Sequence, residues 1–203
     1  MVNENSDSLE IAGSTIKRGE VKQLEIKVAR LYDFTEMSIP VKVIRGKKPG
    51  PRLFVTAALH GDEINGVEII KRLLQKKILK KIRGDLLVIP IVNIFGFNTQ
   101  SRYLPDRRDL NRSFPGNPKG SQAARLANIL FEEIVKKCTH GIDLHTGSNH
   151  RENFPQIRAC VSDPRARKLA KAFEAPVILN SDLLDGSLRA VAKNGKEPLN
   201  LRF

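Results

Sequence analysis

Three short apolar runs, each ending at polar or glycine-containing residues, most constrain how this 203-residue chain can fold. They are residues 53–59 (LFVTAAL), 86–92 (LLVIPIV) and 141–146 (GIDLHT). Short runs with few polar interruptions are typical of strands that are buried on both faces. Between the first two runs, apolar residues recur at helical spacing, which predicts a helix over residues 63–82. A strand, a helix and a second strand of these lengths predict a parallel, right-handed βαβ unit.

The rest of the chain continues this alternation. Residues 93–120 are expected to form a long irregular segment, and loops of that length inside a compact domain are usually functional. Ser121 is expected to cap the next helix. The other predicted elements are strands at 21–30, 38–44, 157–161 and 176–179, a turn at 47–51, and helices at 121–138, 163–173 and 187–193. Together they predict an α/β fold in which helices flank a mostly parallel or mixed central sheet.

Length and composition indicate one globular domain. The chain is 40% apolar and 28% charged, close to the globular average, which excludes wholesale disorder and fibrous repeats. Residues 1–19 are polar and irregular, so we expect a loose N-terminus there and a single domain over residues 20–203. Cys138 and Cys160 lack the spacing of a disulfide framework, and MVNENSDSLE lacks the pattern of a signal peptide. We therefore expect a cytoplasmic protein with no membrane partner.

The charge balance points to an anionic partner. Lys and Arg outnumber Asp and Glu by 35 to 22, which leaves a formal net charge of +13. Such a charge favours nucleic acid, an acidic protein or a phosphorylated or carboxylated small molecule. Aromatic residues make up only 5% of the chain and Trp is absent, so little material exists for the stacking platforms of single-strand binders.

The first candidate site begins at His60, where the first apolar strand ends. Ligands of open α/β sheets gather at the carboxyl ends of strands. His60 and Glu63 are close enough in sequence to bind one cation, and His145 lies at the carboxyl end of the third apolar run. Two imidazoles and one carboxylate are the ligand set of catalytic zinc in several hydrolases. Asp143 faces the same side of its strand as His145 and could accept the second imidazole N–H.

Each of these residues also has an ordinary structural interpretation. His60 could simply end its strand, and Glu63 could stabilise a helix N-terminus. The short pattern HxxE has many accidental matches. Asp143 could be an ordinary polar residue at a strand end.

The second candidate site lies in the long segment and contains Arg102 and residues 107–112 (RRDLNR). Guanidinium and amide groups together recognise carboxylates, and an arginine beside a metal can stabilise a developing oxyanion. A solvated basic loop or a phosphate contact would look the same in sequence.

Four motifs in order resemble the succinylglutamate desuccinylase/aspartoacylase family, relatives of the zinc carboxypeptidases. They are residues 60–63 (HGDE), 93–97 (NIFGF), 109–116 (DLNRSFPG) and 143–147 (DLHTG). Each motif alone is weak, but the four together are specific, and the resemblance runs from about Val21 to about Ala192. It implies a zinc-carboxypeptidase-like α/β fold and a deacylase that hydrolyses an acyl amide of small N-acyl amino acids or related carboxylates.

The resemblance also implies residue roles. It implies one zinc ion per chain, held by His60, Glu63 and His145. Zinc would bring the pKa of a bound water to about 7 and polarise the amide oxygen.

The same match assigns the groups that would bind substrate. Asn111 and Arg112 look like the pair that grips the substrate carboxylate, and Arg102 looks like the arginine that polarises the scissile carbonyl.

One part of the family's pattern is missing from its expected place. Members of the family use a glutamate as general base, on a strand beyond the helix that residues 187–193 match. In the tail NGKEPLNLRF, Glu197 is the only acidic residue, and it precedes the expected strand position. Three accounts remain open: a C-terminally incomplete chain, which we favour; a metal- and ligand-binding form without turnover; or recruitment of Glu197 or Glu152.

A basic segment supports a competing hypothesis, in which the protein binds nucleic acid. Seven cations crowd the predicted helix over residues 63–82 and its end: Lys71, Arg72, Lys76, Lys77, Lys80, Lys81 and Arg83. Such spacing is usual for a solvated helix face, so nucleic acid is not the expected partner. A nucleic-acid-binding domain nevertheless remains the rival hypothesis, because seven cations could follow phosphates.

Overall fold

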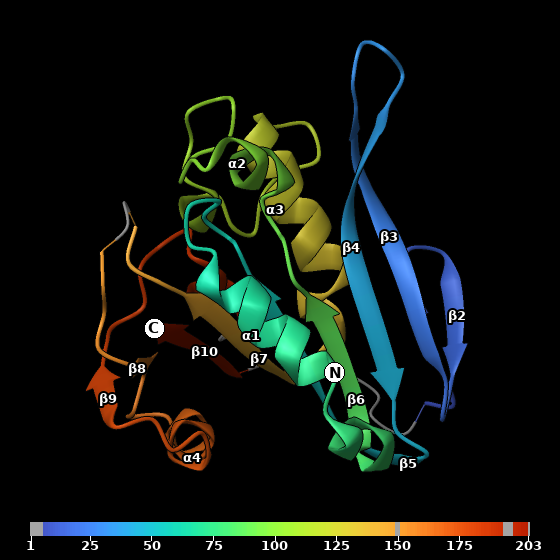
Figure 1. Cartoon of the computed structure of the whole chain (residues 1–203), viewed down its shortest axis with the longest axis vertical. Helices are drawn as coiled ribbons and strands as arrows, with labels where there is room; N and C mark the ends of the chain where they lie inside the picture. The colour runs from blue at the N-terminus through green and yellow to red at the C-terminus, as the bar shows by residue number, and fades with distance from the viewer. Residues whose placement is uncertain (1–5, 149–150, 193–196, 203) are drawn as a thin grey trace.

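An eight-stranded mixed sheet organises the chain (Figure 1). This computed structural model describes residues 6–148, 151–192 and 197–202, and of the last range the backbone alone. The strands of the sheet are β3 (Val21–Arg30), β4 (Glu36–Arg45), β5 (Lys48–Ala57), β6 (Arg83–Ile89), β7 (His140–His145), β8 (Gln156–Ala159), β9 (Val177–Asn180) and β10 (Glu197–Arg202). The predicted α/β class with a mostly parallel or mixed sheet is therefore confirmed.

The order of the strands places β5, which His60 follows, beside β7, which ends at His145. The sheet runs β3-β4-β6-β5-β7-β10-β8-β9. β5 is parallel to both β6 and β7, β7 is parallel to β10, and β8 is parallel to β9. The pairs β3–β4, β4–β6 and β10–β8 are antiparallel. Because β5 and β7 are parallel neighbours, their carboxyl ends lie at the same edge of the sheet.

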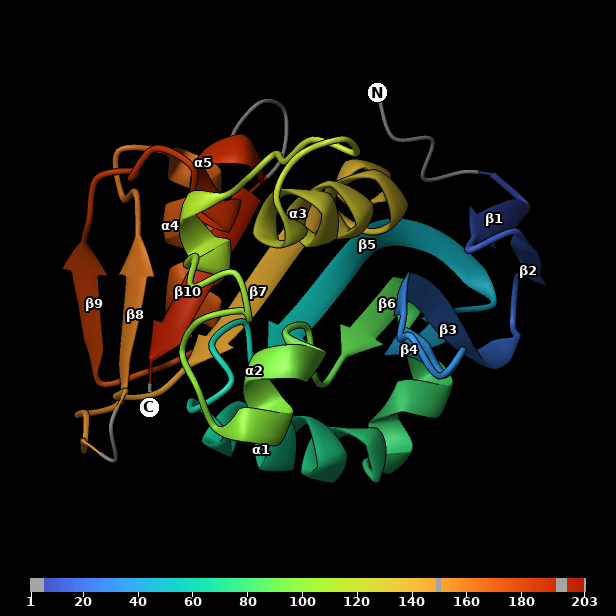
Figure 2. The same cartoon turned by 90° about the horizontal axis from the view of Figure 1, so that it is seen from above.

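Helices cover both faces of the sheet (Figure 2). They are α1 (Asn65–Leu74), α2 (Ile94–Thr99), α3 (Gln122–Glu133), α4 (Pro164–Ala172) and α5 (Leu188–Ala192), with 3₁₀ helices η1 (Lys77–Lys81), η2 (Leu110–Arg112) and η3 (Val135–Lys137). One apolar cluster includes residues of α1 and α4, and another includes residues of α3 and α5. Figure 2 shows α1 and α3 on opposite sides of β5 and β7. Burial of these apolar faces is the main stabilising contribution.

Polar side chains cap α3 and α4, and the predicted cap at Ser121 is confirmed. The Ser121 hydroxyl accepts a hydrogen bond from the Ala124 N–H at 3.2 Å, so it caps α3. The Asp163 carboxylate accepts from the Arg165 N–H at 2.9 Å, and Pro164 follows at the first helical position. Both residues satisfy backbone donors that the first turn of a helix leaves open.

Three local predictions are wrong. The helix predicted over residues 63–82 ends at Leu74, and the rest becomes η1. The predicted turn over residues 47–51 begins β5, although the pairing with β6 is irregular between Lys48 and Arg52. The segment 93–120 is not wholly irregular, because it contains α2 and η2.

The loose N-terminus predicted over residues 1–19 is wrong for residues 8–17. These form a β-hairpin, β1 (Ser8–Ile11) and β2 (Ser14–Lys17). Leu9, Ile11 and Ile16 are buried in the cluster that α3 joins. Residues 1–5 lie outside the described residues.

The tail differs from its prediction as well. Glu197 does not precede a strand but is the first residue of β10, which lies between β7 and β8. Among the described helices, none has the length and apolar character required to cross a bilayer.

Candidate metal centre

The turn between β5 and α1 brings His60 and Glu63 together. Both side chains are buried, at 1% and 3% exposure. A Cβ on Gly61 would come within 1.9 Å of the Gly96 backbone, so only glycine allows this turn to pack against α2. His60 Nδ1 lies 2.8 Å from Glu63 Oε1. The expected pairing of these two side chains is therefore present.

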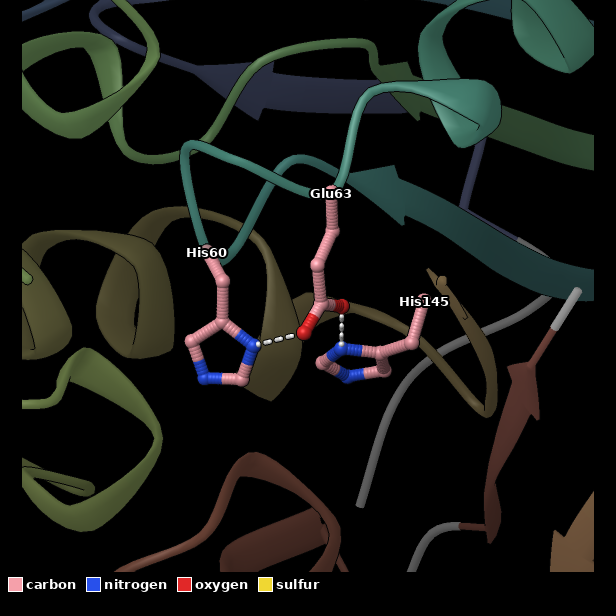
Figure 3. Close-up of side chains that lie close together, drawn as sticks. All are labelled: His60, Glu63 and His145. Carbon is pink, nitrogen blue, oxygen red and sulfur yellow. Dashed lines mark hydrogen bonds and ion pairs between the residues drawn. The ribbon is translucent and has the colours of Figure 1, made fainter. Parts of the chain in front are cut away.

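His145 reaches the same point from the end of β7. Its Nδ1 lies 2.6 Å from Glu63 Oε2, so the carboxylate lies between the two imidazoles (Figure 3). The ring centroids of His60 and His145 are 5.1 Å apart. One donor atom from each of the three side chains lies within 4.8 Å of the others. The structure thus brings together the three residues that the sequence predicted as metal ligands.

A carboxylate holds the outer nitrogen of each imidazole. His145 Nε2 lies 2.7 Å from Asp143 Oδ2, and His60 Nε2 lies 3.1 Å from Asp109 Oδ1. The Thr56 hydroxyl donates to Asp143 Oδ1 at 2.8 Å and holds that carboxylate in place. Carboxylates on the outer nitrogens are the usual means of fixing the orientation and tautomer of metal-binding histidines. In this arrangement both Nδ1 atoms face Glu63.

Arg102 lies beside this cluster. Its Nη1 is 3.3 Å from Glu63 Oε1 and 3.0 Å from the Ser148 hydroxyl oxygen, and its Nη2 is 2.9 Å from Asp109 Oδ2. The Arg102 side chain remains 27% exposed. It is therefore anchored by two carboxylates while part of its surface is open to a ligand.

The side chains of the cluster shift one another's pKa values. Burial alone would raise the pKa of Glu63, but hydrogen bonds from His145 and His60 outweigh it and hold this pKa well below its usual range. Burial would lower the pKa of His145, but the Asp143 carboxylate and Glu63 raise it to about 10. Burial also opposes the ionisation of Asp109, yet His60 and Arg102 keep its pKa low. The carboxylates therefore stay ionised, and their negative charge favours a cation between the two imidazoles.

The predicted substrate-binding pair lies in η2. Asn111 is buried, and its Oδ1 accepts a hydrogen bond from the Leu188 N–H at 2.9 Å, which ties η2 to α5. Arg112 is exposed, and its Nη1 donates to the Asn111 carbonyl at 2.6 Å. η2 is joined to His60 through Asp109, whose carboxylate also accepts from the Asn111 N–H at 2.8 Å.

The two glutamates considered as a general base are placed differently. Glu152 is exposed. Among the described residues, it forms no hydrogen bond with His60, Glu63 or His145. Glu197 pairs in register with His140, five residues before the level of His145. At about 3.3 Å per residue, that is roughly 16 Å along the strand from the histidine.

Sequence reasoning missed two residues of the site. Asp109 was noted within its motif without a role, yet it contacts His60, Arg102 and the η2 backbone. The Ser148 hydroxyl donates to Glu63 Oε1 at 3.1 Å and accepts from Arg102. The pattern Asp-x-Asn indicates that Asp109 caps the N-terminus of a helix. Only the folded structure reveals that the Asp109 carboxylate also contacts His60.

A cavity of about 300 Å³ opens beside the cluster. Its lining is polar and consists of Asp62, Gln100, Ser101, Arg102, Tyr103 and Ser148. Arg102 and Ser148 line this cavity and also contact Glu63. A small molecule in the cavity would therefore lie close to the three candidate metal ligands.

Comparison with known proteins places this site in a family. Residues 49–199 match the family described as the succinylglutamate desuccinylase/aspartoacylase catalytic domain. N-alpha-acetyl-L-2,4-diaminobutyric acid deacetylase of Halomonas elongata is 31% identical over 167 residues, which cover 78% of this chain and 48% of the relative. The chain thus spans about half the length of that curated relative.

Solved structures agree with the match. An aspartoacylase family protein of Mesorhizobium loti superposes with a TM-score of 0.79 and 26% identity over 90% of this chain and 61% of its own. A metallo-carboxypeptidase of Burkholderia cenocepacia, only 12% identical, shares the fold with a TM-score of 0.68 over 89% of this chain and 55% of its own. The carboxypeptidase-like fold is therefore confirmed, and the chain belongs to the succinylglutamate desuccinylase/aspartoacylase family.

Proposed function

We propose that this chain is a zinc-dependent deacylase that hydrolyses the acyl amide bond of small N-acyl amino acids. The observation that carries the proposal is the convergence of His60, Glu63 and His145 at the carboxyl ends of two parallel strands, next to Arg102. Two imidazole nitrogens and one carboxylate oxygen suit zinc, and the outer carboxylates on both imidazoles suit a metal site further. When bound, zinc would activate a water molecule and polarise the amide carbonyl.

The protein side chains supply binding and orientation. Arg102 lines the cavity and stabilises negative charge that develops on the amide oxygen. Ser148 and Asp109 hold the guanidinium in place. Asn111 and Arg112 bind the carboxylate of the amino acid, because an amide N–H and a guanidinium form charge-assisted hydrogen bonds with it. The relative from Halomonas elongata is named for an N-acetyl amino acid, which makes this class the first substrate to test.

The decisive experiment measures zinc content and hydrolysis together. After the metal is removed with a chelator and zinc is added back, we expect one zinc ion per chain. We also expect zinc-dependent release of acetate from N-acetyl-2,4-diaminobutyrate, which proton NMR measures. Loss of an outer-shell partner already costs about 10- to 100-fold in metal affinity, so His145→Ala, which would remove a ligand itself, is expected to lose at least about 100-fold in zinc affinity. His140→Ala, on the same strand at its other end, is the matched control and should bind zinc normally.

Two further outcomes keep the result interpretable. His145→Cys replaces the imidazole by another zinc donor, so it should recover part of the affinity that the alanine variant loses. Unchanged zinc binding by His145→Ala would refute the metal centre. Stoichiometric zinc without any release of acetate would instead favour the non-catalytic, metal-binding alternative.

A further inference from the structure

A group of exposed cations lies at the opposite end of the sheet from the metal centre. We call it the lysine patch. It consists of Lys47, Lys48, Lys76, Lys77, Lys80, Lys81 and Arg83. None of these seven forms an ion pair with any described residue. Lys71 and Arg72, the other cations of the basic segment, pair with Glu68 instead and are not part of the patch.

Two segments distant in sequence build the patch. The residues just before β5 lie against the start of β6, because the Gly46 N–H donates to the Gly84 carbonyl at 2.7 Å. Lys48 is the register partner of Arg83. η1 adds its lysines at the same end of the molecule, the lower end in Figure 1. The cations of both segments therefore form one surface.

An apolar side chain stands in the middle of this charge. Ile78 is 66% exposed in η1, whereas its neighbour Leu79 is half-buried against the core. Residues 45–52 and 75–84 contain neither an acidic nor an aromatic residue. Asp85, which follows, is buried and paired with Arg45 and Arg52, so its charge does not offset that of the patch.

We propose that the lysine patch docks on the surface of an anionic lipid bilayer. The lysines are complementary to acidic headgroups, and Ile78 is placed to enter the boundary between headgroups and acyl chains. Single-stranded nucleic acid fits less well, since the patch offers no ring on which a base could stack. This contact is peripheral, and it departs from the sequence expectation of no membrane partner.

The position of the patch is compatible with catalysis at the other end. β5 begins at Lys48 in the patch and ends at Ala57, just before His60. Nine residue steps of about 3.3 Å separate the two ends of this strand by roughly 30 Å. A protein docked through the lysine patch therefore keeps its metal centre and cavity open to the solution.

The test is co-sedimentation of the full chain with vesicles. We expect binding to phosphatidylcholine vesicles that contain phosphatidylglycerol in a 7:3 mixture, loss of binding in high salt, and no binding to pure phosphatidylcholine. Each lysine near an anionic surface contributes about fivefold to partitioning, so Lys77→Ser/Lys81→Ser should lose about 25-fold. Ile78→Ser should weaken binding while leaving its salt dependence intact.

A matched variant separates this surface from net charge. Lys168→Ser/Lys171→Ser removes the same charge from α4, where both lysines are exposed, and should bind vesicles like the unmodified chain. Far-UV circular dichroism of all variants confirms folding. Equal losses in the two double variants, or no binding to the anionic vesicles, would overturn the proposal. Salt-dependent binding to random duplex DNA without vesicle binding would overturn it in favour of nucleic acid.

Discussion

The Asp143 carboxylate contacts Thr56 and His145, and these two contacts fix the orientation of the His145 ring. Thr56 donates to one of its oxygens, and the other lies 2.7 Å from His145 Nε2. The contact leaves His145 Nδ1 directed at Glu63. A metal at this site would thus depend on a residue that does not itself touch the metal.

We therefore expect Asp143→Asn to weaken zinc binding by about 10- to 100-fold, because the amide is a poorer acceptor and no longer supports the basicity of His145. Zinc affinity is measured by competition with a chromophoric chelator. Asp185→Asn, an exposed site, controls for the loss of one negative charge. An unchanged affinity in Asp143→Asn would contradict a role in orienting the ligand.

Arg102 offers a second test at a single residue. If it stabilises charge on the substrate, Arg102→Ala should reduce kcat by about 10²- to 10³-fold while KM changes much less. Zinc content must be matched between proteins, because Arg102 also contacts Glu63. Arg108→Ala removes an exposed arginine of the same loop and should leave kcat unchanged. A kcat within tenfold of the unmodified enzyme would argue against this role.

Helix α1 depends on a close approach to the sheet. A Cβ on Gly66 would lie 2.8 Å from the Ala57 Cβ and 2.9 Å from the Leu144 Cβ. Both distances are shorter than van der Waals contact, so glycine at this position lets the start of α1 rest on β5 and β7. Glu63 lies three residues earlier, and its position follows from this packing.

Gly66→Ala should therefore lower the free energy of unfolding by about 1–3 kcal/mol, the usual effect of overpacking. The better helix propensity of Ala, about 1 kcal/mol, offsets only part of that loss. Urea unfolding measures the difference. Asn65→Ala, at the exposed preceding position, should be nearly neutral. If Gly66→Ala proved as stable as the unmodified chain, the close approach would not limit the packing of α1.

The N-terminal hairpin is attached to α3 and η3 by charge as well as by apolar contacts. Glu133 accepts from the Ala12 N–H at 3.0 Å and from Lys137 Nζ at 2.8 Å. Burial works against the ionised form, but Lys137 and the Ala12 N–H lower the pKa of Glu133. A lowered pKa in the folded state stabilises the protein above the unfolded value, near 4.5, and this stabilisation is lost as the pH falls through the folded value.

Glu133→Gln should accordingly lower the free energy of unfolding by about 0.5 kcal/mol at pH 7, a small effect because the pair is partly exposed. The difference from the unmodified chain should shrink as the pH falls from 5 to 3. Urea unfolding at several pH values measures it. Glu132→Gln is the control. Glu132 forms an exposed ion pair with Lys136, four residues later in the chain, and this pair does not touch the hairpin. A difference that grows on acidification would contradict the assignment.

The predictable elements were those with one strong local signal. Residues 53–59 and 141–146 were identified because they are short and apolar. The hairpin over residues 8–17 was missed because its apolar residues are few, although Leu9 and Ile11 alternate with polar neighbours and the Ala12–Gly13 turn has positive φ at both positions. The predicted helix over residues 63–82 was too long because apolar residues continue in the pattern beyond Leu74 and cannot by themselves reveal the change to η1.

At the scale of the whole molecule, the convergence of His60, Glu63 and His145 was predictable from the sequence, and the residues around them were not. His60 and His145 each follow a recognisable buried strand, and parallel neighbours end at one edge. Asp109 lies in a segment without periodicity, 49 residues from His60 in sequence, so its contact depends on how that segment folds back. The role of Asn111 in tying η2 to α5 likewise requires knowledge of where α5 packs.

A buried ionic network joins elements at the end of the sheet that lies away from the candidate metal centre. Asp85 accepts from Arg45 Nε at 3.1 Å and from Arg52 Nε at 3.0 Å, and all three residues are nearly inaccessible. Arg45 also donates to the Ile16 carbonyl of the hairpin, and Arg52 donates to the Lys137 carbonyl of η3. One carboxylate thus holds two buried guanidinium groups that join the sheet to the hairpin and to η3, and the less buried Arg18 contacts the same carboxylate at 3.4 Å.

Asp85→Ala should lower the free energy of unfolding by about 3–5 kcal/mol, because it leaves two buried guanidinium groups without their shared carboxylate. Urea unfolding measures the loss. Zinc affinity should stay the same under conditions where the variant is folded, since the network lies at the opposite end of β5 from His60. Asp163→Ala, which removes the cap of α4, should cost only about 1 kcal/mol. Equal destabilisation by the two variants, or a parallel loss of zinc affinity in folded Asp85→Ala, would show that the two ends of the sheet are not independent.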